Sequence, residues 1–165
     1  MRKILYIDFE GSLSKGIREI GYLITEDEQI TYSEEETGLK ALQILQKLQI
    51  KNYSFIVAHN SHVEKNLIKK YFPYEVDQIT KKIRKHNWLD TLKVYRKLYP
   101  RLKKYDLRFL VETFVDEKEL KNEVGKRCQN DKHQFHNPLF DAICVYMLTK
   151  RLKNTINLEH FLNLN

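Results

Sequence analysis

ILYIDFEGS, residues 4–12, carries two carboxylates at the end of an apolar run. Such a run is typical of a buried strand, and on a strand residues two positions apart point to the same face. Asp8 and Glu10 therefore project side by side, while Ile7 and Phe9 point to the other face. Because adjacent carboxylates repel each other, we expect a positive group between them. Acids also end strands for structural reasons, so this stretch alone leaves both interpretations open.

The chain as a whole has the size and composition of one domain. Its 165 residues are enough for a hydrophobic core, and we expect a single domain spanning residues 1–165. The two cysteines, Cys128 and Cys144, form neither a zinc-binding spacing nor a redox pair. No apolar run approaches the roughly 18 residues of a membrane span, and acids interrupt the N-terminal run where a signal peptide would continue. We therefore expect a cytoplasmic protein with no membrane partner.

Positive charge is concentrated in one segment. The chain has 29 Lys and Arg against 22 Asp and Glu, a net charge of +7. Residues 81–108 contain eleven basic and two acidic residues, a net charge of +9, which leaves −2 for the rest. This segment suits a polyanionic partner, because basic groups near phosphates release counterions. A solvated helix surface would have the same charge pattern. The interleaved aromatic residues that could stack on bases are Tyr95, Tyr99 and Tyr105.

The order of the expected elements indicates an α/β fold. The expected strands are residues 3–10, 17–25, 29–33, 54–59 and 87–90. The expected helices are residues 36–49, 61–72, 91–99, 106–114 and 137–152, whereas residues 116–135 are polar and have no assignment. Three antiparallel strands followed by alternating helices and strands predict a mixed five-stranded sheet with helices on both faces.

Glu64 is expected on the inward face of a helix. It shares the i, i+3, i+4 and i+7 spacing with Leu67, Ile68 and Tyr71. Ser61 and Glu64 also form an S-x-x-E pattern, in which the glutamate would reach back to the backbone N–H of the helix cap. The local pattern leaves a metal ligand and a capping box equally open.

Asp141 is expected in the first turn of a helix that Asn137 caps and Pro138 opens. It shares a face with apolar residues, and a bare carboxylate buried there is costly unless a cation or several donors meet it. The helix N-terminus offsets only about 0.3–1 kcal/mol of that cost, which favours a metal. His136 precedes the helix on a loop that can carry it over the same site.

Four carboxylates without a cysteine cluster describe an oxygen-rich site. Such a site suits a hard cation such as Mg²⁺ or Mn²⁺ better than zinc. Two ions about 3.5–4 Å apart would let Asp8 and Glu10 coexist, and could bind a phosphodiester at both its attacking and its leaving oxygen.

The sequence resembles the DEDDh family, the metal-dependent 3′-to-5′ exonucleases of the proofreading type, whose sites combine four acids and a histidine. The three motifs of that family are similar to IDFEG at residues 7–11, AHNSHVE at residues 58–64 and HNPLFDA at residues 136–142. The stretches after the second motif are similar to WLDTLKVYRKLYP at residues 88–100 and YDLRFLVETF at residues 105–114. The resemblance spans nearly the whole chain and implies an RNase H-like fold.

The resemblance also implies roles for individual residues. Two Mg²⁺ ions, for which Mn²⁺ can substitute, would be bound by Asp8, Glu10, Glu64 and Asp141. His136 would act as general base, which suits an imidazole because this group titrates near neutral pH. The residues beside the substrate would be Phe9, Gly11, Ser12, His59 and Asn60.

Two positions depart from the family pattern. The family usually has aspartate in place of Glu64, and the extra methylene shifts the carboxylate enough to alter metal occupancy or rate. Two hydroxyl residues are more usual in place of Gly11 and Ser12, a change that would loosen the grip on the terminal sugar.

The leading interpretation is an exonuclease that hydrolyses single-stranded DNA or RNA 3′ ends to nucleoside monophosphates by two-metal-ion catalysis. The alternative is a catalytically weakened nucleic-acid-binding module of the same fold, and a third interpretation keeps the metals but cuts internally. The sequence does not distinguish DNA from RNA. It also leaves open a homodimer or association with a larger nucleic-acid-processing complex.

Overall fold

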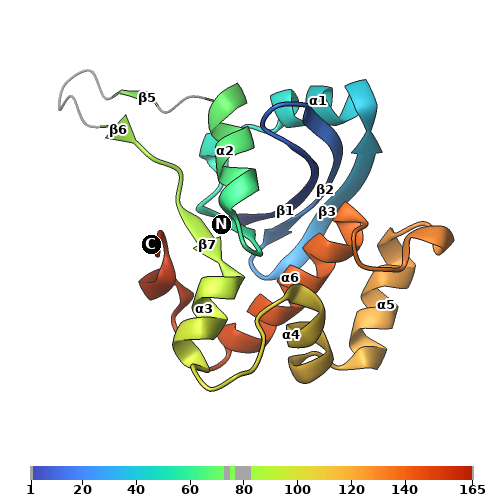
Figure 1. Cartoon of the computed structure of the whole chain (residues 1–165), viewed down its shortest axis with the longest axis vertical. Coiled ribbons are helices and arrows are strands. Elements are labelled where there is room, and N and C mark those ends of the chain that lie inside the picture. The colour runs from blue at the N-terminus through green and yellow to red at the C-terminus, as the bar shows by residue number, and fades with distance from the viewer. Residues whose placement is uncertain (1, 73–74, 77–82, 165) are drawn as a thin grey trace.

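The computed structural model describes residues 2–72, 75–76 and 83–164 (Figure 1). Its main sheet has five strands in the order β3-β2-β1-β4-β7, which confirms the predicted mixed sheet. These strands are β1 (Lys3–Ser12), β2 (Gly16–Glu26), β3 (Gln29–Thr37), β4 (Phe55–Ala58) and β7 (Trp88–Asp90). Two short strands, β5 (Glu75–Val76) and β6 (Ile83–Arg84), pair antiparallel in a sheet of their own.

β1 organises the main sheet because it pairs on both sides. β2 lies antiparallel on one side of it and β4 lies parallel on the other. β3 continues the antiparallel half beyond β2, and β7 continues the parallel half beyond β4. The carboxyl ends of β1, β4 and β7 therefore lie at the same end of the sheet, where α/β folds commonly build sites.

Helices cover both faces of the sheet (Figure 1). One face is covered by α1 (Gly38–Lys47) and α2 (His62–Tyr71), the other by α6 (Pro138–Lys153). Outside α6 lie α3 (Thr91–Leu98), α4 (Leu107–Phe114) and α5 (Glu117–Arg127). Short 3₁₀ turns span Ile50–Asn52, Asn130–Lys132 and Leu158–Phe161. Within the described ranges, no helix combines the length and apolar character needed to cross a membrane.

Alternation along β1 divides the hydrophobic core into two parts. Ile4 and Tyr6 point to the α6 side, whereas Leu5, Ile7 and Phe9 point to the side of α1 and α2. α6 is enclosed by the sheet and by the outer helices, and 13 of its 16 residues are buried. The even-numbered positions of β1 consequently face the helix that carries the third predicted motif.

Gly21 of β2 is the place where α6 meets the sheet most closely. A Cβ atom at this position would lie 2.0 Å from the backbone nitrogen of Leu139 and 2.1 Å from the carbonyl carbon of Pro138. Only glycine permits this approach. Pro138 opens α6 as predicted, but Asn137 does not cap it through its side chain, which instead donates to the Gln134 carbonyl at 3.0 Å.

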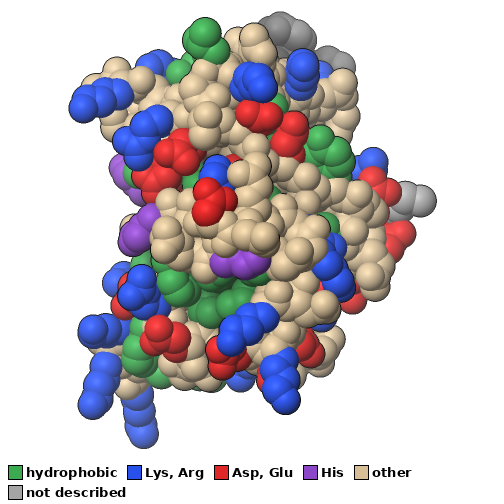
Figure 2. Space-filling view, turned by 90° about the vertical axis from the view of Figure 1, so that its right-hand side faces the viewer, with side chains coloured by type: hydrophobic (Ala, Val, Ile, Leu, Met, Phe, Trp, Pro, Cys, Tyr) green, Lys and Arg blue, Asp and Glu red, His purple; other side chains and the backbone are tan. Residues whose placement is uncertain are grey.

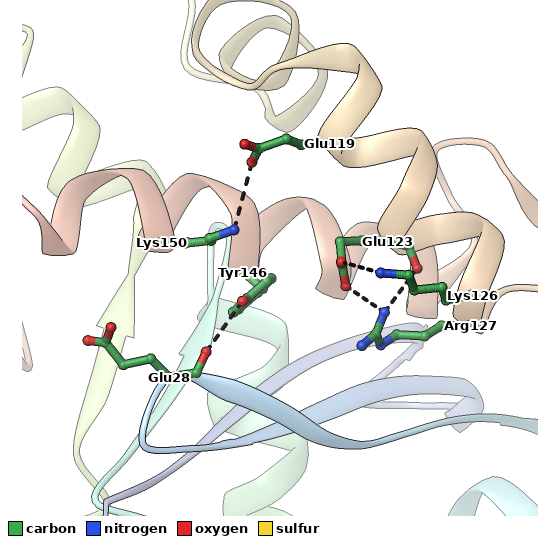
Figure 3. A network of polar contacts seen from close by, with 7 residues as sticks. All are labelled: Glu28, Glu119, Glu123, Lys126, Arg127, Tyr146 and Lys150. Carbon is green, nitrogen blue, oxygen red and sulfur yellow. Dashed lines mark hydrogen bonds and ion pairs between the residues drawn. The ribbon is translucent and has the colours of Figure 1, made fainter.

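α5 occupies part of the polar region to which the sequence pattern assigned no element. Asp116 caps α5 by accepting the Glu119 N–H at 2.9 Å. Glu123 forms ion pairs with Lys126 and Arg127 one turn along the same helix (Figure 3). Val124 is buried and the other residues of α5 are at least partly exposed. Caps and charge pairs, not apolar periodicity, therefore define this helix.

Polar contacts also attach α6 to its neighbours (Figure 3). Lys150 of α6 lies 3.7 Å from a carboxylate oxygen of Glu119 in α5. On the sheet side, the Tyr146 hydroxyl donates to the carbonyl of Glu28 at 3.4 Å, in the turn between β2 and β3. α6 is thus fastened to both the outer helix and the sheet.

Candidate active site

The first two predicted carboxylates lie near the end of β1. Asp8 is opposite Gly21 of β2 and faces α6, whereas Phe9 is buried beneath α1 and α2. The carboxylate of Glu10 lies 3.0 Å from the guanidinium of Arg18. The strand register shifts directly after Glu10, so a bulge ends the regular pairing at this acid.

Glu64 is buried in the first turn of α2. It is 5% exposed, and its Oε2 atom has no hydrogen-bond partner among the described residues. Ser61 precedes the helix, but its backbone N–H and its hydroxyl both donate to Asp90, at 3.0 and 2.9 Å. The N–H that a capping box requires is therefore already used, so Glu64 does not form a capping box with Ser61.

Asp90 at the end of β7 is a site residue that the sequence analysis did not identify. It is 4% exposed and accepts four hydrogen bonds. The donors are the backbone N–H groups of Asn60, Ser61 and Leu92 and the Ser61 hydroxyl. One buried carboxylate thereby joins the β4–α2 loop to the start of α3. It also fixes the start of α2, the helix that carries Glu64. An acid that ends a strand and precedes a helix is the signal that could have revealed it.

Asp141 and His136 meet at the start of α6. The backbone N–H of His136 donates to Oδ2 of Asp141 at 3.1 Å, and the Asp141 Oδ1 atom has no partner among the residues described. Asp141 is 8% exposed, whereas His136 is exposed. His136 has a φ of 70°, a left-handed conformation that is unfavourable for most residues other than glycine. The loop before α6 is therefore held in a specific, strained form beside Asp141.

The carboxylates are electrostatically coupled to one another. Burial raises the pKa of Asp8 well above its ordinary value, and the charges of Asp141, Glu64 and Glu10 raise it further. Burial also raises the pKa of Glu64 to about 7 and the pKa of Asp141 to about 6. The structure thus brings together acids from β1, α2 and α6. Perturbed groups in one place are typical of functional sites.

The donor set at this site fits a hard cation. All four predicted ligands are carboxylates. Two of them have a buried oxygen with no partner among the described residues, Glu64 Oε2 and Asp141 Oδ1. In the part of the chain that the structure describes, no three His, Cys, Asp or Glu side chains are grouped so that they could hold an ion as they stand. Arg18 pairs with Glu10, so Glu10 would have to exchange a guanidinium for a metal.

The predicted substrate residues of β1 serve the strand and its turn. Phe9 is 6% exposed, so its ring belongs to the core. Gly11 follows the bulge, and a Cβ atom there would lie 2.4 Å from the carbonyl oxygen of Gly16. The Ser12 hydroxyl accepts the backbone N–H of Lys15 at 3.1 Å and so closes the turn between β1 and β2. Phe9 therefore offers little surface to a nucleotide in this structure.

The predicted substrate residues His59 and Asn60 shape the loop before Glu64. His59 Nδ1 lies 2.9 Å from the Thr91 hydroxyl, and burial lowers the pKa of His59 to about 4. Its ring is therefore neutral and packed toward α3. Asn60 has a φ of 53°, a left-handed conformation that asparagine adopts more readily than most residues, and its N–H donates to Asp90.

Basic side chains border the carboxylate group. Arg108 of α4 lies 5.0 Å from the centre of the Phe135 ring and is close enough to lower the pKa of Asp141, against the larger effect of burial. Figure 2 shows histidines near the middle of one face, with Lys and Arg side chains above and below them and acidic side chains interspersed. Lys81 and Lys82, which begin the basic segment, lie outside the described residues.

The tyrosines of the basic segment contribute to the core. Tyr95 is fully buried, and its hydroxyl donates to the Leu148 carbonyl at 3.1 Å. Tyr99 and Tyr105 are partly buried against the same core. A role for Tyr95 in stacking on bases is excluded by its burial.

Comparison with known proteins supports this architecture. No family model and no curated protein matches the sequence. The order and direction of the strands define an RNase H-like fold. The structure is similar to "Exonuclease X in complex with 5′ overhanging duplex DNA", with a TM-score of 0.60 and 19% sequence identity, over 98% of this chain and 97% of that chain. The predicted resemblance to 3′-to-5′ exonucleases of the DEDDh type is thereby confirmed at the level of the fold.

Proposed function

We propose that the chain is a metal-dependent 3′-to-5′ exonuclease, built as one domain of residues 1–165. The observation that carries this proposal is the coupled group of Asp8, Glu64 and Asp141, whose pKa values are all raised by burial. Acids that repel one another inside a protein weaken its fold, so their presence together is best explained by binding of cations. The similarity to the fold of Exonuclease X supports the same function.

The proposed metal ligands are Asp8, Glu10, Glu64 and Asp141. Two Mg²⁺ ions, or Mn²⁺ in their place, would neutralise these acids and the charge that develops on the phosphodiester. The Oε2 atom of Glu64 has no partner in the described part of the chain, which supports its assignment as a ligand even though its side chain is longer than the usual aspartate. Asp90 would keep Glu64 in place through the β4–α2 loop.

His136 is the proposed general base. It would accept a proton from the water that attacks the terminal phosphodiester. The attack would form a new P–O bond and break the bond to the 3′ oxygen of the preceding nucleotide. This oxygen would take a proton from solvent to become the new 3′ hydroxyl, and a nucleoside 5′-monophosphate would be released. His136 is exposed while its backbone is bound to Asp141, so its ring can reach a substrate that arrives from solvent.

Single-stranded nucleic acid 3′ ends are the proposed partners. Arg108 lies near Asp141, and Arg96 lies close enough to His59 to affect its pKa. Both arginines belong to the basic segment, and they would bind backbone phosphates without reading base sequence. This assignment fits both DNA and RNA.

A catalytically weakened binding module is the second candidate. The pair between Glu10 and Arg18 favours it, because a guanidinium that stays on Glu10 removes one of the four proposed ligands. Such a module would bind nucleic acid equally well with and without divalent metal.

The two candidates are separated by an assay on 5′-labelled single-stranded DNA, single-stranded RNA and duplex DNA with a 5′ overhang. Each substrate is incubated with Mg²⁺, with Mn²⁺ and with EDTA, using wild type, Asp8→Asn and the α5-cap variant Asp116→Asn as matched control. We expect a metal-dependent ladder that shortens from the 3′ end in wild type and control but not in Asp8→Asn. Binding without cleavage in either metal would support the binding module. A circular single strand is tested beside these substrates, and its cleavage would indicate an endonuclease.

A further inference from the structure

Asp8, Gly21 and Glu35 form one row across three strands. Asp8 of β1 is opposite Gly21 of β2, and Gly21 is opposite Glu35 of β3. Directly opposite residues share a face of the sheet, so all three face α6. The start of α6 lies against Gly21, between the two acids of the row. Asp8 belongs to the proposed metal site, whereas the proposed function assigns no role to Glu35.

Glu35 binds both ends of the segment that precedes and opens α6. One carboxylate oxygen accepts the backbone N–H of Leu139 at 3.4 Å, and the other lies 3.0 Å from the ammonium group of Lys132. The Glu35 side chain is only 6% exposed, and that of Lys132 is 24% exposed. The carboxylate end of this pair is therefore shielded from the solvent that weakens surface ion pairs.

The segment between these two contacts contains the proposed general base. His136 lies four residues after Lys132 and three before Leu139. Its backbone has a φ of 70°, so it needs external contacts to keep its conformation. One such contact is the bond from the His136 N–H to Asp141, and Glu35 fixes the chain on either side of it.

We propose that Glu35 is a positioning residue that holds the His136 loop over the metal site by binding Lys132 and Leu139 together. The inference rests on the proposed function of His136. Glu35 would not touch the substrate or the metals. It would instead determine how often the loop is in the form that places His136 beside Asp141, and so affect kcat more than KM.

The experiment combines hydrogen–deuterium exchange with steady-state kinetics on four variants. Glu35→Ala removes both contacts, Glu35→Gln keeps an acceptor for Leu139 but loses the ion pair, and Lys132→Met removes only the ion pair. Glu36→Gln is the matched control, because its side chain lies on the opposite face of β3.

We expect amide exchange in residues 131–137 to become about tenfold faster in Glu35→Ala, with kcat reduced about tenfold and KM changed less than about twofold. The exchange rates and kcat values of Glu35→Gln and Lys132→Met should fall between those of wild type and Glu35→Ala. Both quantities should match wild type in Glu36→Gln. Unchanged exchange, or a change in KM alone, would overturn the proposal. If wild type cleaves no substrate, the proposed function fails, while the exchange result still decides whether Glu35 holds the loop.

Discussion

Ser61 donates both its backbone N–H and its hydroxyl to Asp90, at 3.0 and 2.9 Å. These two hydrogen bonds from one residue to one carboxylate oxygen connect the end of β7 to the start of α2. The opposite oxygen of Asp90 accepts the N–H groups of Asn60 and Leu92. α2, which carries Glu64 in its first turn, begins directly after this arrangement, so the position of Glu64 depends on a residue that is not itself a proposed ligand.

Asp90→Asn should therefore destabilise the protein strongly, although the two side chains have nearly the same shape. The amide nitrogen would face two donors, which leaves buried groups unsatisfied and costs about 2–4 kcal/mol of unfolding free energy. Urea denaturation measures this value. Asp106→Asn is the control, because Asp106 caps α4 at an exposed position where asparagine serves equally well and the change should stay below about 0.5 kcal/mol. Equal effects of the two substitutions would contradict this role of Asp90.

Gly21→Ala should displace α6 from the sheet. The new methyl group would lie 2.0 Å from a backbone atom of Leu139, and backbone cannot move aside as a flexible side chain can. We expect a loss of about 3 kcal/mol or more, seen as a lower thermal midpoint. Gly125→Ala on α5 is the matched control, because a Cβ atom there meets nothing within 4 Å and alanine favours a helix by about 0.5–1 kcal/mol. A tolerated Gly21→Ala would show that α6 sits farther from β2.

The parts of the fold that follow from local pattern could be predicted. The alternation at Asp8 and Glu10, the inward spacing of Glu64 and the Pro-initiated helix before Asp141 each depend on neighbours a few positions away. These signals suffice to predict the sheet and to place the acids at its carboxyl end. α5 has no comparable signal, because Val124 is its one buried residue and its caps and charge pairs resemble an ordinary polar stretch.

The supporting contacts of the site could not be predicted because they join distant positions. Glu35 meets Leu139 across 104 residues of sequence, and Asp90 meets Ser61 across 29. Nothing near Glu35 in the sequence distinguishes it from Glu34 or Glu36, the acids on either side. Similarly, Tyr95 is buried by its contact with α6, which is distant in sequence. Its position within a basic segment alone therefore resembled that of a base-stacking residue.

His59 should make the protein sensitive to mild acid. Burial lowers its pKa from the ordinary 6.5 to about 4, so the unfolded chain binds a proton at a pH where the folded protein does not. The resulting stability is present above about pH 6.5 and is lost as pH falls toward 4, by about 2–3 kcal/mol in total. Denaturation of wild type and His59→Gln between pH 4 and 7 measures the difference, with exposed His160→Gln as control. Parallel pH curves for wild type and His59→Gln would contradict this expectation.

Glu64→Gln should stabilise the metal-free protein while it abolishes catalysis. Burial raises the pKa of Glu64 from the ordinary 4.5 to about 7, so stability due to its neutral form is complete below pH 4.5 and is lost as pH rises through 7. Glutamine stays neutral, and at pH 8 in EDTA the variant should gain up to about 3 kcal/mol in unfolding free energy over wild type but little at pH 4. Mg²⁺ should raise the thermal midpoint of wild type more than that of the variant, because only the carboxylate binds the ion well. A variant that is less stable at pH 8 in EDTA, or that gains equally from Mg²⁺, would show that Glu64 supports the fold and not a metal.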